Sequence, residues 1–347
     1  MTLFKDMAEK EFSFSTAFSV LCTDLPQRSR DIIASRFGID AARALTLEAI
    51  GKKYGITRER VRQIVQSSIE SVCAKKDSTY FRMAKERMEE TLAKNSGIMR
   101  EEDFFARMSG GDAQEEAIAR FFFLCMSHIV TDEDAAMERA VMENDFDRTF
   151  WHTIVESGKA FLTKSGKTVS SDAFFSHISR TMPVDDKLFF DFLSVSREIK
   201  RNVFGKWGLS HWSDIAPKGM REKAYLVLQE QGESMHFRDI AEAINRHGLT
   251  NGDRIAHPQT VHNELIKDRR CVLVGRGYYA LAAWGYRDGT VRDVLEEILR
   301  ASAAPIRREE ILRRVLEKRR VKKSTVMINL NTFFEKVGHD SYTARHS

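Results

Sequence analysis

One apolar spacing recurs four times along this chain, and it constrains the fold more than any other feature. In each occurrence the second apolar residue comes five positions after the first, and the third comes nine positions after the first. Successive occurrences lie 66 to 71 residues apart. The four sets are Met99, Phe104 and Met108; Val169, Phe174 and Ile178; Met235, Ile240 and Ile244; and Ile306, Ile311 and Val315. A period of this length predicts tandem copies of one small structural unit.

The surroundings of each set predict what that unit is. An acidic or Ser-Asp start precedes the second apolar residue, as at the beginning of a short helix, and amphipathic stretches lie before and after it. A polar or glycine-rich turn with a following aromatic residue then closes each unit: Trp151, Trp212, Tyr279 and Tyr342. The clearest hairpin is CVLVGRGYYAL, which starts at Cys271. Helix, short helix, helix and hairpin is the order of a winged helix, so we expect four winged-helix-like units.

Phenylalanines are frequent in the two middle units, and their helical spacing predicts core positions rather than a base-stacking surface. They are Phe104, Phe105, Phe121, Phe122, Phe123, Phe174, Phe175, Phe189 and Phe190. Basic residues are sparse on the third helices of these units, which favours spacers or protein-docking modules.

The stretch GITRERVRQI, from Gly55 to Ile64, predicts a different motif ahead of the repeats. Thr57 is a good helix N-cap, and TLEAIGKKY before it forms a short amphipathic helix. Gly55 between the two helices completes a helix-turn-helix pattern, which offers its second helix to the DNA major groove. The outward residues of that helix suit base edges: Arg58, Glu59, Arg62 and Gln63.

RFGID from Arg36, TLEAIGKKYGITRERVRQI from Thr46 and the spacer between them resemble region 4 of bacterial primary sigma factors. The family pattern overlays this chain without a gap from about Arg28 to Ile64. The resemblance implies that the second helix recognises the upstream promoter element through the four base-reading residues, and that RNA polymerase core is a partner. The expected phosphate-contacting residues are Arg28, Arg36, Thr57 and Arg60. Nothing in the chain resembles the sigma regions that bind the polymerase clamp, so we do not expect a complete sigma factor.

Residues 218–285 resemble the HARE-HTH family, a winged helix known from the delta subunit of bacterial RNA polymerase and from chromatin- and restriction-associated proteins. The segments AYLVL, HFRDIA, TVHNEL and GRGYYAL carry this resemblance. Members of the family do not share one ligand, so the resemblance implies a fold and no site. The last unit is a more distant relative, and the two units between Tyr80 and Trp212 are identified only by their spacing.

Basic residues concentrate toward the C-terminus. The chain has a net charge of +5, and the segment from Arg307 to Lys323 alone has nine basic and three acidic residues. Such a surplus fits a polyanionic partner. The expected secondary basic surface consists of Lys267, Arg269, Arg270, Arg276, Arg319, Arg320, Lys322 and Lys323. The last four would lie at the entry to a third helix capped by Ser324, although a solvated basic run without a ligand has the same appearance.

Other functional classes have little support in the sequence. The four cysteines form no CxxC pair and are interpreted as buried thiols in a reducing cytosol. There is no signal peptide and no apolar run long enough to cross a bilayer, so we expect a cytoplasmic, nucleoid-associated protein without a membrane partner. No histidine falls in a metal-binding spacing, and His236 is expected to cap a helix or lie on the surface. We therefore predict no catalytic residue, no metal, no small-molecule cofactor and no enzyme activity.

These observations give a mainly α-helical fold in five domains. We expect the helix-turn-helix domain at 1–79, winged-helix-like units at 80–152 and 153–213, the HARE-HTH-like winged helix at 214–286, and the basic unit at 287–347. The favoured function is a bacterial DNA-binding transcription protein that binds double-stranded promoter-type DNA, RNA polymerase, or both. Two alternatives stay open: a polymerase-docking scaffold with little DNA contact, and the DNA-targeting component of a restriction or modification system.

Overall fold

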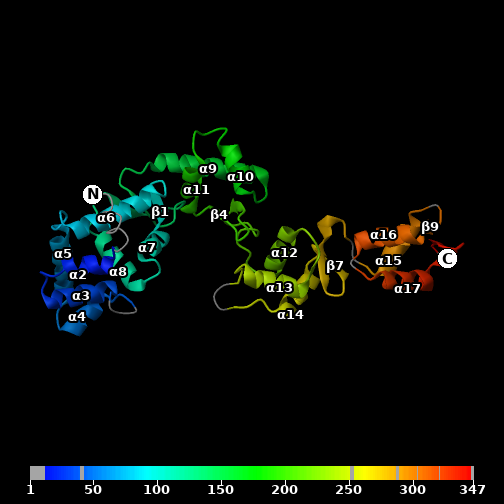
Figure 1. The fold of residues 1–347 in the computed structure, drawn as a ribbon, viewed down its shortest axis with the longest axis horizontal. Helices are drawn as coiled ribbons and strands as arrows, with labels where there is room; N and C mark the ends of the chain where they lie inside the picture. The colour runs from blue at the N-terminus through cyan, green and yellow to red at the C-terminus, as the bar shows by residue number, and fades with distance from the viewer. Residues whose placement is uncertain are drawn as a thin grey trace. The chain divides into compact units, whose positions relative to one another are not determined.

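The computed structural model describes residues 12–39, 43–250, 254–286, 289–302, 304–319 and 321–344. Within these ranges the protein is mainly helical, with small antiparallel sheets (Figure 1), which confirms the expected fold class. The chain divides into two compact units, Met1–Lys200 and Arg201–Ser347, and the five proposed domain boundaries stay predictions. No described helix combines the length and the apolar character that a bilayer crossing requires.

The first unit opens with four helices, called the head from here on. They are α2 (Phe14–Leu21), α3 (Gln27–Phe37), α4 (Leu47–Tyr54) and α5 (Arg58–Cys73). Thr46 caps α4 and Thr57 caps α5, each through a hydroxyl that accepts from a backbone amide. Gly55 makes the turn between these helices with φ +64°, a left-handed conformation that glycine adopts without strain. Ile50 and Val61 are fully buried beneath the turn, as the expected helix-turn-helix requires.

A winged-helix-like arrangement follows the head and is called the first module. Its elements are α6 (Thr79–Ala93), β1 (Ile98–Arg100), α7 (Glu101–Ser109), α8 (Ala113–Phe123), β2 (Ile129–Asp132) and β3 (Ala140–Glu143). The antiparallel sheet has the order β1-β3-β2. The strand before the second helix therefore pairs with the last strand, and β2 and β3 form the wing.

One hydrophobic core runs through the head and the first module. Phe18 of α2 and Phe37 of α3 each lie edge-on to Phe121 of α8, with ring centroids 5.3 Å apart. The Glu115 carboxylate of α8 accepts hydrogen bonds from the backbone amides of the first two residues of α2, at 2.7 and 2.9 Å. Helix α8 thus supplies an anionic cap to the free amides at the start of α2.

The second module continues the first unit with α9 (Arg148–Ser165), α10 (Ser171–Ile178) and α11 (Asp186–Ser194), and β4 (Ile199–Arg201) follows at the boundary of the two units. Trp151 lies in the first turn of α9, which corrects its assignment to the end of a hairpin. The reason is that Asp147 starts a helix here by accepting from the Phe150 amide at 2.8 Å. The buried Trp151 indole then donates to the Phe192 carbonyl at 2.9 Å.

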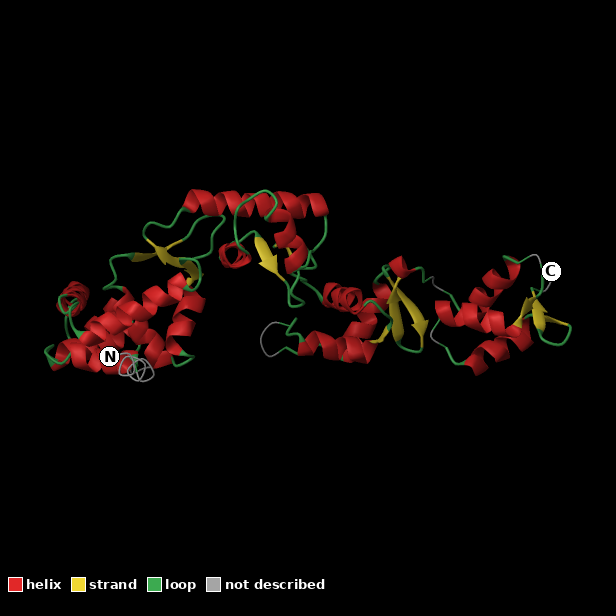
Figure 2. Cartoon of the chain, turned by 45° about the horizontal axis from the view of Figure 1, so that its top comes forward, coloured by secondary structure: helices red, strands yellow, loops and turns green. Residues whose placement is uncertain are grey.

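The second unit contains β5 (Trp207–Leu209) and two further modules (Figure 2). The third module consists of α12 (Met220–Gln231), β6 (Met235–His236), α13 (Phe237–Arg246), α14 (Pro258–Lys267), β7 (Cys271–Gly275), β8 (Tyr278–Leu281) and the 3-10 turn η1 (Ala282–Trp284). The fourth consists of α15 (Val291–Arg300), β9 (Ile306–Arg307), α16 (Arg308–Lys318), α17 (Lys323–Phe333), β10 (Glu335–Val337) and β11 (Ser341–Thr343). Their sheet orders, β6-β8-β7 and β9-β11-β10, repeat the topology of the first module.

The recurring apolar spacing now has a structural explanation. Its first residue lies in β1, β6 and β9 in three of the four sets, and its second and third residues face inward from the helix that follows. All eight of these helical residues are buried. His236 confirms its expected role by capping α13, where its Nδ1 accepts from the Arg238 amide at 3.3 Å. The middle phenylalanines are core residues as expected, with Phe123, Phe175 and Phe190 only partly buried.

Candidate nucleic-acid interface

The outer face of α5 is open to solvent. Arg58, Glu59, Arg62 and Gln63 are all exposed, and the side chains of Glu59 and Arg62 are each 59% accessible. The opposite face carries the buried Val61 and Ser68. With 3.6 residues per turn, the spacing of these positions places the polar residues on one side of the helix and the buried residues on the other. The four expected base-reading residues therefore project from one continuous surface.

Two of these residues form a preorganised ion pair. Arg62 donates from Nη2 to Glu59 Oε1 at 2.7 Å and from Nε to Glu59 Oε2 at 3.0 Å. The hydrogen bond from Arg62 lowers the pKa of the Glu59 carboxyl, and the same bond raises the pKa of the Arg62 guanidinium. The two hydrogen bonds between Arg62 and Glu59 fix the plane of the guanidinium. The pair contributes little to the free energy of folding because both groups are solvated. Other hydrogen-bonding partners can therefore replace this pair at little cost.

Arg60 and Gln63 form a second pair, in which Arg60 Nη1 donates to Gln63 Oε1 at 3.2 Å. The Gln63 side chain also hydrogen-bonds the Glu59 carboxyl, which contributes to the lowered pKa of that group. Thr57, which is also expected to contact phosphate, uses its oxygen to accept from the Arg60 amide at 3.1 Å. Its hydroxyl hydrogen keeps the capacity to donate.

The remaining phosphate-contacting candidates hold the head together in the free protein. Arg28 donates to the Tyr54 carbonyl at 2.8 Å, at the end of α4, where a cation also meets the negative end of the helix. Arg36 is half-buried and donates to the Leu45 carbonyl at 3.3 Å. Two basic residues not predicted from the sequence, Lys52 and Lys53, are exposed in the last turn of α4. Their position beside the glycine turn was the signal available for them.

The expected secondary basic surface is only partly a surface. Arg319 is 4% exposed and donates to the carbonyls of Leu273 and Gly289, so its assignment to that surface was wrong. The guanidinium tolerates burial because two backbone carbonyls from other segments accept hydrogen bonds from it. Arg320 lies outside the described residues.

Arg270 is engaged within the third module. It pairs with Asp268 at 2.7 Å, and its guanidinium lies 4.0 Å from the centre of the Tyr225 ring. The hydrogen bond with Asp268 raises the pKa of Arg270. Lys267 forms an exposed pair with Glu264 at 3.1 Å, whereas Arg269 and Arg276 are exposed without an ion pair to any residue that the structure describes.

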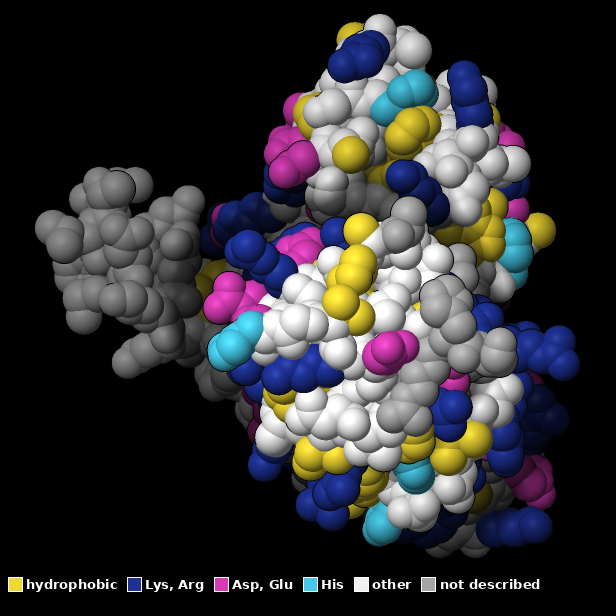
Figure 3. Space-filling view, turned by 90° about the vertical axis from the view of Figure 1, so that its right-hand side faces the viewer, with side chains coloured by type: hydrophobic (Ala, Val, Ile, Leu, Met, Phe, Trp, Pro, Cys, Tyr) yellow, Lys and Arg dark blue, Asp and Glu magenta, His cyan; other side chains and the backbone are white. Residues whose placement is uncertain are grey.

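Helix α17 starts two residues earlier than expected. Lys322 occupies the N-cap position, and Ser324 lies inside the first turn, so Ser324 is not the cap. No side chain caps this helix because lysine has no acceptor for the free amides. Lys322 and Lys323 are both exposed. Lysine and arginine side chains project from many points of the face shown in Figure 3, interspersed with acidic and apolar ones.

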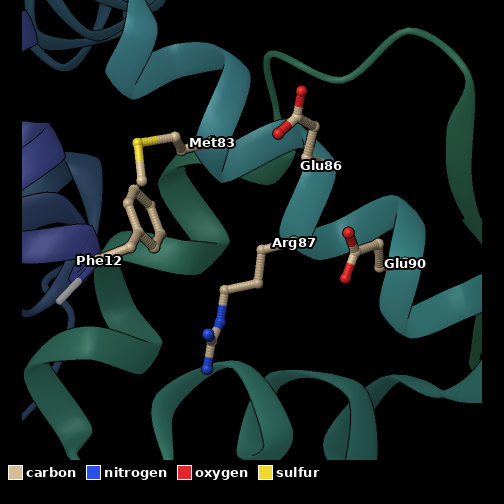
Figure 4. Close-up of a pocket in the computed structure, with 5 residues that line it drawn as sticks. All are labelled: Phe12, Met83, Glu86, Arg87 and Glu90. Atoms are coloured by element: carbon tan, nitrogen blue, oxygen red, sulfur yellow. The ribbon is translucent and has the colours of Figure 1, made fainter. Parts of the chain in front are cut away.

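A small pocket of about 200 Å³ lies on α6 of the first module. Figure 4 shows Phe12 beside Met83 at one end, and Arg87 leaving the helix away from Glu86 and Glu90. Carboxylates and a guanidinium along one helix are typical of a solvated face and do not define a ligand. Among the described residues, no group of three His, Cys, Asp or Glu side chains is arranged to hold a metal ion.

The comparisons with known proteins concern the head. Residues 23–72 match the family described as Sigma-70, region 4. The chain is 49% identical over 45 residues to the RNA polymerase principal sigma factor HrdD of Streptomyces viridifaciens, which is 13% of this chain and 14% of that protein. It is 50% identical over 40 residues to the RNA polymerase sigma factor SigA of a Bacillus species, 12% of this chain and 11% of that protein. These matches confirm the resemblance drawn from Arg28 to Ile64, and they span a small part of each sigma factor.

Proposed function

We propose that this protein binds promoter-type duplex DNA through α5 of the head and acts as an RNA polymerase-associated transcription regulator. The observation that carries the proposal is the exposed, ordered face of α5 inside a segment that matches Sigma-70, region 4. Arg58 and Arg62 would donate to guanine edges, Glu59 would accept from cytosine, and Gln63 would pair with adenine. The role is one of binding, and we assign no catalytic step, metal or cofactor to it.

The modules behind the head would support this role by adding contacts. We propose that the third module is a HARE-HTH-like winged helix, on the strength of its sequence segments and of its β6-β8-β7 sheet. Linked binding modules raise the effective concentration of each other's sites, so individually weak contacts add to a useful affinity. A cytoplasmic, nucleoid-associated location is the setting in which such a protein would work.

The test is duplex binding by the whole protein against salt concentration, for the wild type and for Arg62→Ala. The DNA is a randomised pool followed by the selected sequence. Loss of a base-reading arginine should weaken the selected site by about 1–3 kcal/mol and relax the preference at one position. The affinity for random duplex should change little, because phosphate contacts supply most non-specific binding.

Arg60→Ala is the matched control, since it removes the same charge from the same helix. It should weaken all sequences alike and reduce the salt slope by about one. If both variants retain wild-type affinity and selectivity while core polymerase still co-purifies with the protein, the head does not recognise DNA. The polymerase-docking scaffold is then the function to accept.

A further inference from the structure

The third and fourth modules are joined by a buried arginine. Arg319, at the end of α16, donates from Nη1 to the carbonyl of Leu273 on β7 at 2.5 Å. It also donates from Nη2 to the carbonyl of Gly289, between the modules, at 2.7 Å. The side chain is 4% exposed, although its basic neighbours Lys318 and Lys322 are exposed. A buried guanidinium is tolerated only when such acceptors compensate for its lost hydration.

The segment that contains Gly289 is fixed as well. Gly289 has φ +138°, and a side chain there would meet the Asp293 carboxylate at 3.0 Å. Asp293 in turn accepts from the Thr290 amide and hydroxyl, which closes a capping box at the start of α15. The hydrogen bonds with Thr290 lower the pKa of Asp293, and the charge of Arg319 contributes in the same direction. Arg319 therefore joins β7, the connector and α16 at one point.

This contact brings together basic residues that the sequence places in separate groups. Arg276 is three residues after Leu273, and Lys322 is three residues after Arg319. Three residues span at most about 11 Å, so both lie near the contact between the modules. Arg269 and Lys323 are each one residue further away along the chain. These four exposed residues, Arg269, Arg276, Lys322 and Lys323, are called the seam cluster.

Two acidic residues of these modules are already paired with other cations. Glu297 pairs with Lys318 at 3.1 Å, and Asp268 pairs with Arg270 at 2.7 Å. By contrast, no residue of the seam cluster has an ion pair within the described ranges. Four exposed cations without ion pairs, two from each of the joined modules, create a locally positive field on this part of the surface.

We propose that the seam cluster is a second duplex-binding site, which contacts the phosphate backbone without reading sequence, and that Arg319 is its positioning residue. A phosphate backbone carries negative charges at regular intervals, so it can contact exposed cations on two modules at once. A single small anion could not contact all of them. This inference extends the proposed function by adding a site that stabilises any duplex the head has selected. It does not depend on the sequence that α5 recognises.

The experiment measures the salt dependence of binding of the whole protein to a random duplex. Lys322→Ala/Lys323→Ala and Arg269→Ala/Arg276→Ala each remove half of the cluster. Each loss of two phosphate contacts should reduce the slope of log K against log salt by roughly 1.8. Between 50 and 200 mM salt the wild-type affinity should then fall roughly 12-fold further than that of either variant. Lys164→Ala/Lys167→Ala removes two exposed lysines from the first unit as the matched control.

Arg319→Met tests the positioning role, because it removes no exposed charge. The slope should fall by roughly one or more while circular dichroism stays unchanged, since the hydrophobic cores of the two modules do not include this residue. Arg319→Lys keeps a donor and should recover part of the loss. If Arg319→Met also loses helical signal, the two surface variants decide the question alone.

Two results would overturn the inference. One is a pair of surface variants that change the slope no more than the lysine control. The other is a folded Arg319→Met protein with the wild-type slope, which would remove the positioning role. Failure of the head proposal looks different, because Arg62→Ala would then leave sequence preference intact whatever the seam variants do to the slope.

Discussion

Replacement of Phe121 by alanine tests whether the head and the first module fold as one body. The Phe121 ring is fully buried and lies edge-on to Phe18 and Phe37 at 5.3 Å and to Phe122 at 5.7 Å. Truncation of a buried phenylalanine costs about 3–5 kcal/mol, and an edge-on ring pair adds about 0.5–1.5 kcal/mol beyond the buried area. We expect a loss of about 5 kcal/mol, comparable to the whole stability of many domains.

The assay is native-state hydrogen exchange of the whole protein, resolved by peptide. In a shared core, Phe121→Ala lowers the opening free energy of α3 and α5 by about the same amount as that of α6 and α8. Phe161→Ala is the control, because this half-buried ring stacks on Phe174 and His177 in the second module. It should leave the head peptides unchanged. Wild-type protection of the head in a variant that has lost protection of α8 would refute the shared core.

Two further predictions concern the partly buried Glu115 and two buried thiols. Glu115→Gln should cost about 1–3 kcal/mol in urea denaturation, because the charged acceptor of two amides at the start of α2 becomes neutral; Glu116→Gln, which weakens only a surface pair with Arg120, should cost less than about 1 kcal/mol. Burial raises the pKa of Cys22 to about 11 and that of Cys271 to about 12, from a value of 9.0. Since the folded-state pKa is the higher one, the stabilisation is present below pH 9 and is lost as the pH rises from 9 toward these values. Both thiols should react slowly with iodoacetamide at pH 8.5 in the folded protein and readily in urea, and equal rates in the two conditions would contradict the burial.

Local chemistry accounts for the parts of the fold that the sequence predicts well. Thr57 and Gly55 each specify one backbone conformation, so the helix-turn-helix follows from a few neighbouring residues. The repeated apolar spacing likewise reports a strand and a helix that face one core. The position of Trp151 was mispredicted because a helix start at Asp147 and a hairpin turn have similar residue compositions. Its position depends on which neighbours α9 packs against.

Charge patterns predicted the site less completely than apolar patterns predicted the fold. The basic run around Arg319 is uniform in sequence, yet the structure buries this residue and exposes Lys322 and Lys323. The difference comes from carbonyl acceptors at Leu273 and Gly289, which are 46 and 30 residues away. A local pattern holds no information about such distant partners. Similarly, the sequence around Arg28 does not predict its hydrogen bond to the Tyr54 carbonyl.

The shared core also changes how the family match should be interpreted. The matched segment ends at residue 72, but the hydrophobic cluster around it continues to Val141. At the far end of α5, the Cys125 thiol from the first module lies 3.8 Å from the Ile69 carbonyl. Helix α5 is thereby fixed to the first module at one end and exposes, at the other, the face that we propose reads bases. Under the proposed function, a duplex bound to this face must also fit beside the first module. The position of α5 on DNA therefore depends on the folding of residues beyond 72.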